Sequence, residues 1–423
     1  MRSRRSVLVL SVILASSIIL YGQDVKLDIN RAIDKAYKHD YELRNSEIDV
    51  NSSDQEVKKA YKDLMPKVNY NGKYTKYDNP TRMNSKDVNE YTENEFIIEQ
   101  PLFEGGALLA KLDSAKQIRN KQNYLYKDTK INTKLNTIDK YLRVLVSNEE
   151  LKVYQVSLES LQKQYEKINR KYELDMVSKT EVLPINTRVL NLKTQVVEAN
   201  NNIAVSLTDL KNYIGIKHED SVSLENIQEN LYDVSGINIE KDVKYIREFN
   251  RNVKIVDIDK KVKENDKKVA RSEFLPKVSG FYSQKAGDER TSHSGDDFNW
   301  QAGVAVKMNI FEFGSSINEY NIKDNEVKKA ENLRALTKDN LELQLRKNYL
   351  NLVKFKGIVD EQEAAVLSAR ENYNLEGRRF EMDLIDAVSF VQIEQTLVDT
   401  ELALLVARYN YYMAFAQYKS LLE

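Results

Sequence analysis

Residues that could carry out chemistry are few in this chain, and they are scattered. Its 423 residues include no Cys and 3 His, which are His39, His218 and His293. A chain without Cys has no disulfides, no thiolate metal sites, no cysteine nucleophile and no cysteine for lipid attachment. Histidine can act as a general base or a metal ligand, but these three fall in an expected helix turn, a linker and an exposed loop. Because the sequence also lacks a Gly-rich phosphate loop and a His-Glu-x-x-His zinc motif, we expect no enzyme activity, no cofactor and no metal.

The composition describes the elements that must position any functional side chain. The 64 Lys and Arg residues balance 65 Asp and Glu residues, whereas a nucleic-acid-binding protein should carry a basic excess on at least one face. Charged residues make up 30% of the chain, which has only 13 Gly and 5 Pro. This combination predicts long, solvated helices and argues against a compact enzyme.

The first 22 residues have the organisation of a secretory signal peptide. Three arginines precede an apolar run from Val7 to Leu20, and the small residue Gly22 follows. The alternative, a membrane anchor, needs about 20 apolar residues, and this run is shorter. We predict cleavage near Gly22 and export from the cytoplasm.

The rest of the chain has the pattern of a tandem repeat. Met65-Pro66-Lys67-Val68 recurs as Leu275-Pro276-Lys277-Val278, at an offset of 210 residues, and residues 172–177 recur as 380–385, at an offset of 208. In each half the expected order is helix, strand, strand, long helix, turn and helix, because each proline ends a helix before an extended segment. The predicted divisions are a signal peptide over 1–22, a first repeat over 23–215, a linker over 216–236 and a second repeat over 237–423.

The segment from Phe298 to Ile310 carries the clearest strand pattern. Its apolar face comprises Phe298, Trp300, Ala302, Val304, Val306, Met308 and Ile310. The opposite face is mostly polar, and this two-residue period is typical of a strand with two unlike faces. A transmembrane β-strand needs about 9–11 residues, with apolar side chains toward lipid and polar ones toward the lumen. The pattern therefore predicts a lipid-facing strand, and a half-buried strand of an ordinary sheet is the alternative that it leaves open.

Three weaker segments share this pattern, which gives four strands per chain. Two of them follow Pro66 and Pro276 and one precedes Pro101, with hairpin tips expected over about 78–90 and 287–297. An open sheet edge in lipid leaves backbone groups unpaired, and the smallest barrels have eight strands. Two copies would supply eight strands and three copies twelve, and only the larger barrel leaves an open lumen for the polar face. We therefore expect a homotrimer with a 12-stranded transmembrane β-barrel embedded in lipid.

The remaining segments are expected to form long coiled-coil helices. The stretches 106–174 and 314–382 would each reach about 100 Å as helix. Alternating spacings of three and four produce stripes in both halves: Leu192, Val196, Ala199, Ile203, Ser206, Leu210 and Tyr213, then Leu402, Leu405, Tyr409, Tyr412 and Ala416. A second stripe, which comprises Ala403, Ala407, Tyr411, Ala414 and Tyr418, lies on another side of the last helix and indicates a second neighbour. Such stripes bury a seam between neighbouring helices. The predicted fold class is mainly α with a β-barrel part: a long coiled-coil α-helical barrel joined to a transmembrane barrel.

With this order in place, the chain resembles the TolC family of outer-membrane factors, the outer-membrane efflux proteins. The likeness covers the whole mature chain and depends on the duplicated element order, the Leu-Pro-Lys-Val steps and the junction Phe311-Glu312-Phe313-Gly314. The resemblance implies a trimer in the Gram-negative outer membrane that extends into the periplasm as a helical tunnel. The implied partners are a periplasmic adaptor (membrane fusion) protein and an inner-membrane transporter. The implied function is the exit duct of an efflux pump or a type I secretion system.

The resemblance also gives roles to the two helix–turn–helix tips. Family members contact the adaptor through a Val-Gly-Leu-like triplet, which corresponds here to Leu174-Asp175-Met176 and Met382-Asp383-Leu384. Both triplets carry Asp in place of the family's glycine. Asp tolerates positive φ better than most residues, so it could replace a glycine that is used for its backbone conformation. It could not replace a glycine that is used for close backbone approach, and the docking geometry would then differ.

The family's tunnel is narrowest at this end, so nearby charges are candidates for the periplasmic entrance. Asp383 and Asp386, repeated around a threefold axis, would favour cations. Arg378 and Arg379 would hold neighbouring helices by salt bridges, and because an exposed pair contributes about 0–1 kcal/mol, gating would need several of them.

Two functions from different classes follow from these patterns. The first is a passive outer-membrane exit duct, for which a partner supplies the energy. The second is a secreted or periplasmic coiled-coil scaffold or adhesin without a membrane pore, whose strands form a small soluble sheet. They differ in what covers the apolar face of the segment Phe298–Ile310, which is lipid in the first case only.

Overall fold

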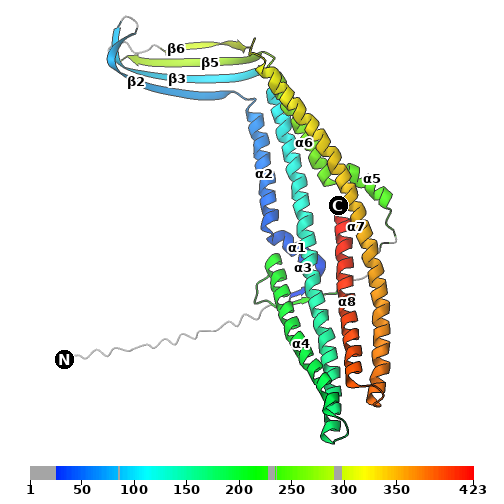
Figure 1. Ribbon diagram of the computed structural model, residues 1–423. Coiled ribbons are helices and arrows are strands. Elements are labelled where there is room, and N and C mark those ends of the chain that lie inside the picture. Colours follow the sequence, from blue (N-terminus) through cyan, green and yellow to red (C-terminus); the bar gives the residue numbers. More distant parts are fainter. Residues whose placement is uncertain (1–24, 84–85, 227–233, 235, 290–297) are drawn as a thin grey trace, which may run out of the picture.

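The computed structural model describes residues 25–83, 86–226, 234, 236–289 and 298–423 of the chain. The predicted signal peptide over 1–22 lies outside these residues. The molecule is elongated, with a β-sheet at one end and a bundle of long helices that runs away from it to two helical tips (Figure 1). A mainly helical fold with one sheet of four long strands is therefore confirmed.

The helices include two that are 67 residues long, as the two long uninterrupted segments predicted. The helices are α1 (Ile29–His39), α2 (Tyr41–Lys62), α3 (Ala107–Glu173), α4 (Lys179–Ile214), α5 (Ile239–Phe249), α6 (Arg251–Ser272), α7 (Ser315–Glu381) and α8 (Ala387–Ser420). The long helices α3 and α7 each begin after a glycine in the left-handed region, Gly106 at φ 86° and Gly314 at φ 84°. A glycine adopts this conformation without a Cβ clash, which lets the chain turn sharply from strand to helix.

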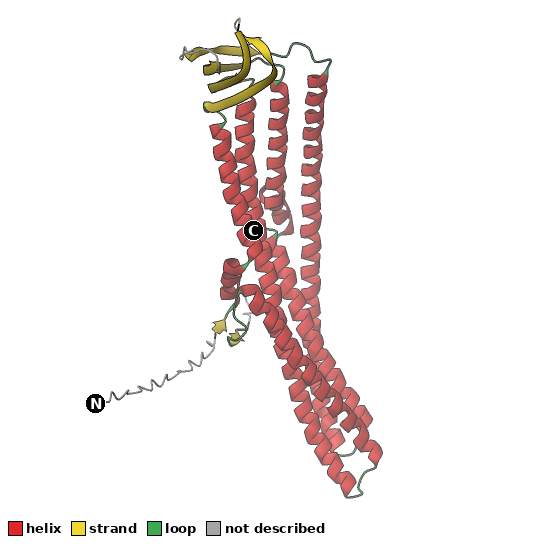
Figure 2. Ribbon diagram, turned by 90° about the vertical axis from the view of Figure 1, so that its left-hand side faces the viewer, coloured by secondary structure: helices red, strands yellow, loops and turns green. Residues whose placement is uncertain are grey.

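The strands form two separate sheets. They are β1 (Val25–Leu27), β2 (Lys67–Met83), β3 (Lys86–Glu104), β4 (Val222–Leu224), β5 (Lys277–Glu289) and β6 (Phe298–Lys307). The large sheet has the order β2-β3-β5-β6, and all of its neighbours are antiparallel. Figure 2 shows this sheet curved above the helix ends. The small sheet is the parallel pair β1-β4, which the sequence reasoning missed because three-residue strands leave no periodic signal.

The predicted strand boundaries were wrong at both ends of the large sheet. The polar loop expected over 78–90 is much shorter, because β2 continues to Met83 and β3 begins at Lys86; β5 likewise continues to Glu289. At the other end, β6 stops at Lys307, so Met308 and Ile310 lie beyond the strand. Its partner β5 begins at Lys277, which pairs with Lys307, so β5 offers no backbone to the residues that follow.

The helical core consists of seams between helices. A large cluster joins α5, α6, α7 and α8, and a second joins α3, α4, α7 and α8 close to the tips. Leu192 and Ala199 of the first predicted stripe are almost fully buried in the second cluster, and Leu210 is buried in a third cluster that joins α1, α3 and α4. On α8, Ala407, Tyr411, Ala414 and Tyr418 of the second predicted stripe are buried in the first cluster. The other predicted stripe on α8, which comprises Leu402, Leu405, Tyr409, Tyr412 and Ala416, is half-buried. The four helices next to the sheet lie in the order α2-α3-α6-α7. This order matches the strand order β2-β3-β5-β6, because each of these helices directly precedes or follows the corresponding strand in the chain.

Candidate functional site

The two faces of the large sheet differ in chemistry. On one face the register aligns Val68, Ile98, Tyr282 and Ala302 in one row, and Tyr70, Phe96, Gln284 and Trp300 in the next. The side chains of Trp300, Val304 and Val306 on this apolar face are 68%, 63% and 66% exposed in the single chain. The strand that the sequence predicted is confirmed from Phe298 to Lys307, and the side chain of Phe298 lies outside the described residues. An apolar face of this extent needs a cover that the single chain does not provide.

The opposite face is polar and more enclosed. Ser283 on this face is 3% exposed, whereas its neighbour Tyr282 on the apolar face is 37% exposed. A curved sheet shields its concave side, so the polar face is the inner, concave one. Lys285 Nζ lies 3.4 Å from Glu95 Oε1 on this face, and Ser283 Oγ donates to the same carboxylate oxygen over 2.9 Å.

The outer edges of the sheet and of the helix layer lie on the same two sides. In the described residues β2 and β6 each pair on one side only, and each therefore presents one free backbone edge. Below them, α2 and α7 are the outermost helices and expose apolar residues at seven-residue spacing. These residues are Tyr41 and Ile48 on α2, and Leu336, Leu343 and Leu350 on α7.

Both helical tips have the same turn, and both turns depend on an aspartate. Asp175 has φ 57° and Asp383 has φ 59°. At the first tip, Met176 N donates to Lys171 O over 2.8 Å and Asp175 N donates to Tyr172 O over 2.9 Å. The second tip repeats both bonds at equivalent residues. This is a Schellman cap, in which the left-handed residue is usually glycine. The two Asp residues therefore occupy positions of positive φ. Asp can replace the family's glycine at such a position, because it tolerates positive φ better than most residues.

Polar contacts join the two tips. Lys171 at the end of α3 lies 2.7 Å from Asp383 Oδ1, and Lys167 lies 2.7 Å from Glu381 Oε1. Glu181, in the first turn of α4, accepts a hydrogen bond from the backbone N–H of Ala387 over 2.9 Å. The predicted entrance residue Asp383 is thus brought together with a lysine of the neighbouring hairpin.

Two of the other predicted entrance residues, Asp386 and Arg379, have partners close to them in the sequence. Asp386 is the N-cap of α8, and its side chain accepts a hydrogen bond from Ser389 N over 2.7 Å. This bond holds the pKa of Asp386 below its ordinary value. Arg379 pairs with Glu376 of its own helix at 2.9 Å. Arg378 lies beside it in the last turn of α7, where its charge is favourable to the helix dipole.

A buried ion pair lies between the hairpins, above the tips. Arg188 Nε of α4 lies 2.6 Å from Glu394 Oε2 of α8, and the two side chains are 8% and 2% exposed. Ser157 of α3 donates to the other carboxylate oxygen of Glu394. Sequence reasoning missed this cluster, because a lone Arg and a lone Glu on solvated helices give no signal of burial.

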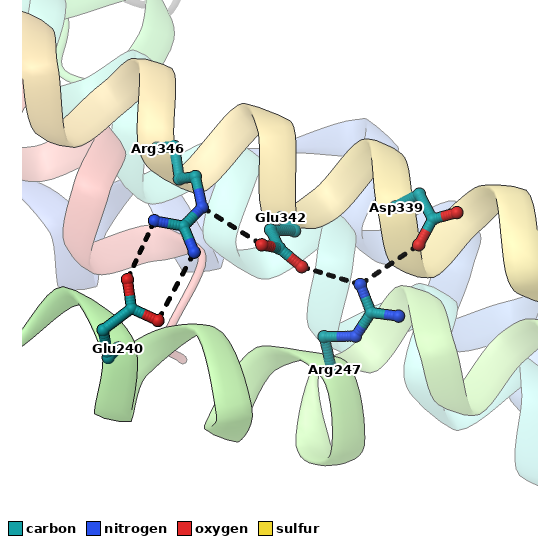
Figure 3. A network of polar contacts seen from close by, with 5 residues as sticks. All are labelled: Glu240, Arg247, Asp339, Glu342 and Arg346. Atoms are coloured by element: carbon teal, nitrogen blue, oxygen red, sulfur yellow. Dashed lines mark hydrogen bonds and ion pairs between the residues drawn. The ribbon is translucent and has the colours of Figure 1, made fainter.

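A second polar network fastens α5 to the side of α7 (Figure 3). Arg247 of α5 lies 3.1 Å from Asp339 and 2.7 Å from Glu342, while Arg346 of α7 lies 3.1 Å from Glu342 and 3.0 Å from Glu240. The side chains of Glu342 and Asp339 hold the pKa of Arg247 above its ordinary value. Alternating charges of this kind fix the orientation of a short helix on a long one.

Neither a metal-binding cluster nor a membrane-spanning helix is found among the described residues. Within them, no group of three or more His, Cys, Asp or Glu side chains is arranged to hold a metal ion. No helix in this part of the chain combines the length and the apolar character that crossing a membrane requires.

Solved structures with the same fold come from several bacteria. A membrane protein from Pseudomonas aeruginosa has a TM-score of 0.82 at 14% identity, over 93% of this chain and 90% of that one. The Campylobacter jejuni CmeC outer membrane channel has a TM-score of 0.78 at 16% identity, over 93% and 85%. The outer membrane protein VceC from Vibrio cholerae has a TM-score of 0.80 at 12% identity, over 93% and 96%. Identities this low show a shared fold alone.

The sequence itself carries a family signature. A comparison with curated proteins gave no significant match. The family model described as "Outer membrane efflux protein" matches residues 32–216 and 247–422, which is most of both halves. The chain therefore belongs to the outer membrane efflux protein family, and is an outer-membrane exit duct of efflux pumps, not an enzyme.

Proposed function

We propose that three copies of this chain form the duct by joining their four-stranded sheets into a 12-stranded barrel. The observation that carries this proposal is the combination of an apolar convex face with two free edges, β2 and β6. In lipid each unpaired backbone group costs several kcal/mol, so these edges must meet. Joining β6 of one copy to β2 of the next closes the sheet, and three copies leave a lumen for the concave polar face.

The helices support the same ring. The exposed stripes of α2 and α7 lie on the two sides of the protomer that meet when the sheets join, so α7 of one copy would pack against α2 of the next. Tyr41 and Ile48 would then be covered by residues such as Leu343 and Leu350. Coiled-coil seams with this seven-residue spacing bury apolar side chains between neighbouring helices. The result is a helical tunnel continuous with the barrel.

The two halves of each protomer have the same order of elements, which supports an origin as a tandem repeat. The order is two helices, two strands, a long helix and a shorter helix, first from α1 to α4 and then from α5 to α8. Three protomers built this way would place six similar units around the axis. In this proposal residues 23–215 are the first repeat, 216–236 are the linker and 237–423 are the second repeat. Residues 1–22 are the signal peptide, which is removed on export.

A pair of adjacent substitutions in β6 tests the barrel. Val304 lies on the apolar face, and its neighbour Ala305 lies on the polar face opposite Ser279. An arginine at the lipid face near the bilayer midplane costs about 2–4 kcal/mol per copy, whereas a lumen position tolerates it. We expect Val304→Arg to abolish assembly in the outer membrane and Ala305→Arg to preserve it, as measured by membrane fractionation. Equal assembly of both variants would contradict the proposal.

We further propose that the tips dock a periplasmic adaptor that joins the duct to an inner-membrane transporter. The contacting residues would be Leu174, Asp175 and Met176, together with Met382, Asp383 and Leu384. Four of these side chains, Leu174, Met176, Met382 and Leu384, are 61–70% exposed at the extreme end of the helices, which is the form of an apolar docking surface. Asp383, Asp386, Arg378 and Arg379 would line the periplasmic entrance that this docking opens.

A cysteine scan tests the docking. Because the chain has no Cys, a single cysteine at Asp383 is a unique crosslinking site. We expect it to capture the adaptor in cells, while a cysteine at Glu159, an exposed residue of α3 farther from the tip, captures none. Capture at neither position would count against docking at the tips. The alternative of a pore-free scaffold or adhesin is not favoured, because the chain belongs to a family of outer-membrane channels.

A further inference from the structure

Acidic residues on the concave face of β3 are each placed opposite a lysine. The register pairs Glu93 with Lys73 and Glu99 with Lys67, both on β2. It pairs Glu95 with Lys285 and Glu104 with Lys277, both on β5. Directly opposed residues of antiparallel strands lie on the same face of the sheet, and their side chains are within reach of each other. The register thus places each of these four carboxylates opposite a lysine. Lys285 is the lysine of this set that forms ion pairs with carboxylates of β3, whereas Lys67 lies 3.1 Å from Asp63 and Lys277 lies 2.9 Å from Glu273.

Glu95 and Lys285 form an ion pair in an enclosed part of the concave face. The Glu95 side chain is 16% exposed and lies 3.4 Å from Lys285 Nζ, and Lys285 also lies 3.8 Å from Glu93 Oε1. Ser283 Oγ completes the cluster with its bond to Glu95. The charges are therefore held in fixed positions on the concave face and face each other across the β3–β5 seam.

We propose that these opposed lysines and carboxylates, above all the cluster of Lys285 with Glu93 and Glu95, determine the charge selectivity of the barrel by balancing the charge of its lining. This inference rests on the proposed three-copy barrel, in which the concave face surrounds the lumen. Unpaired charges of one sign on a pore wall favour ions of the opposite sign. Paired charges present short dipoles instead, so the barrel admits cationic, anionic and zwitterionic solutes alike. The lysines are then as necessary for the passage of anionic solutes as the carboxylates are for cations.

Neutralising one partner at a time tests this inference. In a closed barrel of three copies, Glu95→Gln removes three negative charges and leaves each Lys285 with Glu93 alone, whereas Lys285→Gln removes three positive charges from beside Glu93 and Glu95. At about 0.1 M salt the Debye length is about 10 Å, so such charges still act within the lumen. From reversal potentials of the purified channel in planar bilayers under a KCl gradient, we expect the K⁺/Cl⁻ permeability ratio to fall about twofold for Glu95→Gln and to rise about twofold for Lys285→Gln.

A double variant and two controls make the result specific. Glu95→Gln with Lys285→Gln removes both charges and should return the ratio to the wild-type value. Lys73→Gln, which leaves Glu93 without its opposed lysine, should act in the same direction as Lys285→Gln. Glu225→Gln changes an exposed carboxylate beside the small β1-β4 sheet and should change nothing.

The outcomes separate this inference from the barrel on which it rests. Open pores with an unshifted ratio in Glu95→Gln, Lys285→Gln and Lys73→Gln would overturn the inference and leave the barrel intact. A double variant that differs from wild type as much as either single variant would also overturn it. Wild-type protein that remains a single chain and does not insert into bilayers would overturn the barrel itself, and the inference with it.

Discussion

Removing the carboxylate of Glu394 should loosen the lower half of the duct more than any surface change. Glu394 is 1% exposed, and its partner Arg188 is 7% exposed, so the substitution Glu394→Ala leaves a buried guanidinium with no counter-charge. Breaking a buried pair in this way costs about 3–5 kcal/mol, because the remaining guanidinium stays largely buried without its counter-charge. The same substitution removes the acceptor of the Ser157 hydroxyl. The pair joins α4 of one hairpin to α8 of the other, so the loss falls on the contact between hairpins.

Hydrogen exchange of the assembled protein measures this loss locally. We expect amides of α4 and α8 around the pair to exchange faster in Glu394→Ala by a factor that corresponds to about 3–5 kcal/mol, with the sheet unchanged. Arg188→Met should have a similar effect. Replacing both residues, as Arg188→Met with Glu394→Leu, should cost less than either single change because no unpaired charge remains. A single variant that costs less than about 1 kcal/mol, or a double variant that costs the sum of both, would refute this reasoning.

Three further changes test individual contacts. Asp175→Gly should slow exchange in the first tip turn by relieving about 1 kcal/mol of left-handed strain, and faster exchange would contradict the positive φ. Asp386→Ala should loosen the start of α8 at neutral pH. Because the pKa of Asp386 is lowered by its bond to Ser389, this effect should be complete above the ordinary carboxyl pKa of about 3.9 and fade as the pH falls through the lowered value; a difference that persists at lower pH would contradict the capping role. Tyr418→Phe removes the donor of a 2.5 Å bond to Asp242 and should lower thermal stability by about 1–3 kcal/mol, and an unchanged melting temperature would contradict it.

The sheet was predictable from the sequence wherever one face differs from the other. The alternation around Trp300 and Val304 predicted β6, and Pro66 and Pro276 marked the starts of β2 and β5. Alternation alone could not say where β6 ends. Met308 and Ile310 continue the pattern, but a strand needs a backbone partner, and that partner is set by the start of β5.

Contacts between distant segments were beyond the sequence. The strands β1 and β4 pair although they lie in different parts of the chain, and the Tyr141 hydroxyl oxygen of α3 lies 2.9 Å from Leu27 O and 2.6 Å from Glu225 O beside them. None of these residues has a local pattern that predicts the contact. The tips were the reverse case, because a glycine position occupied by Asp175 and Asp383 indicated the positive φ that the structure has.

The number of chains in the particle tests the central claim most directly. Native mass spectrometry of the channel, extracted from the outer membrane in detergent, should give the mass of three mature chains, because only a ring can pair the free edges of β2 and β6 and cover the apolar stripes of α2 and α7. A stable single chain, fully folded in buffer without detergent, would contradict the account.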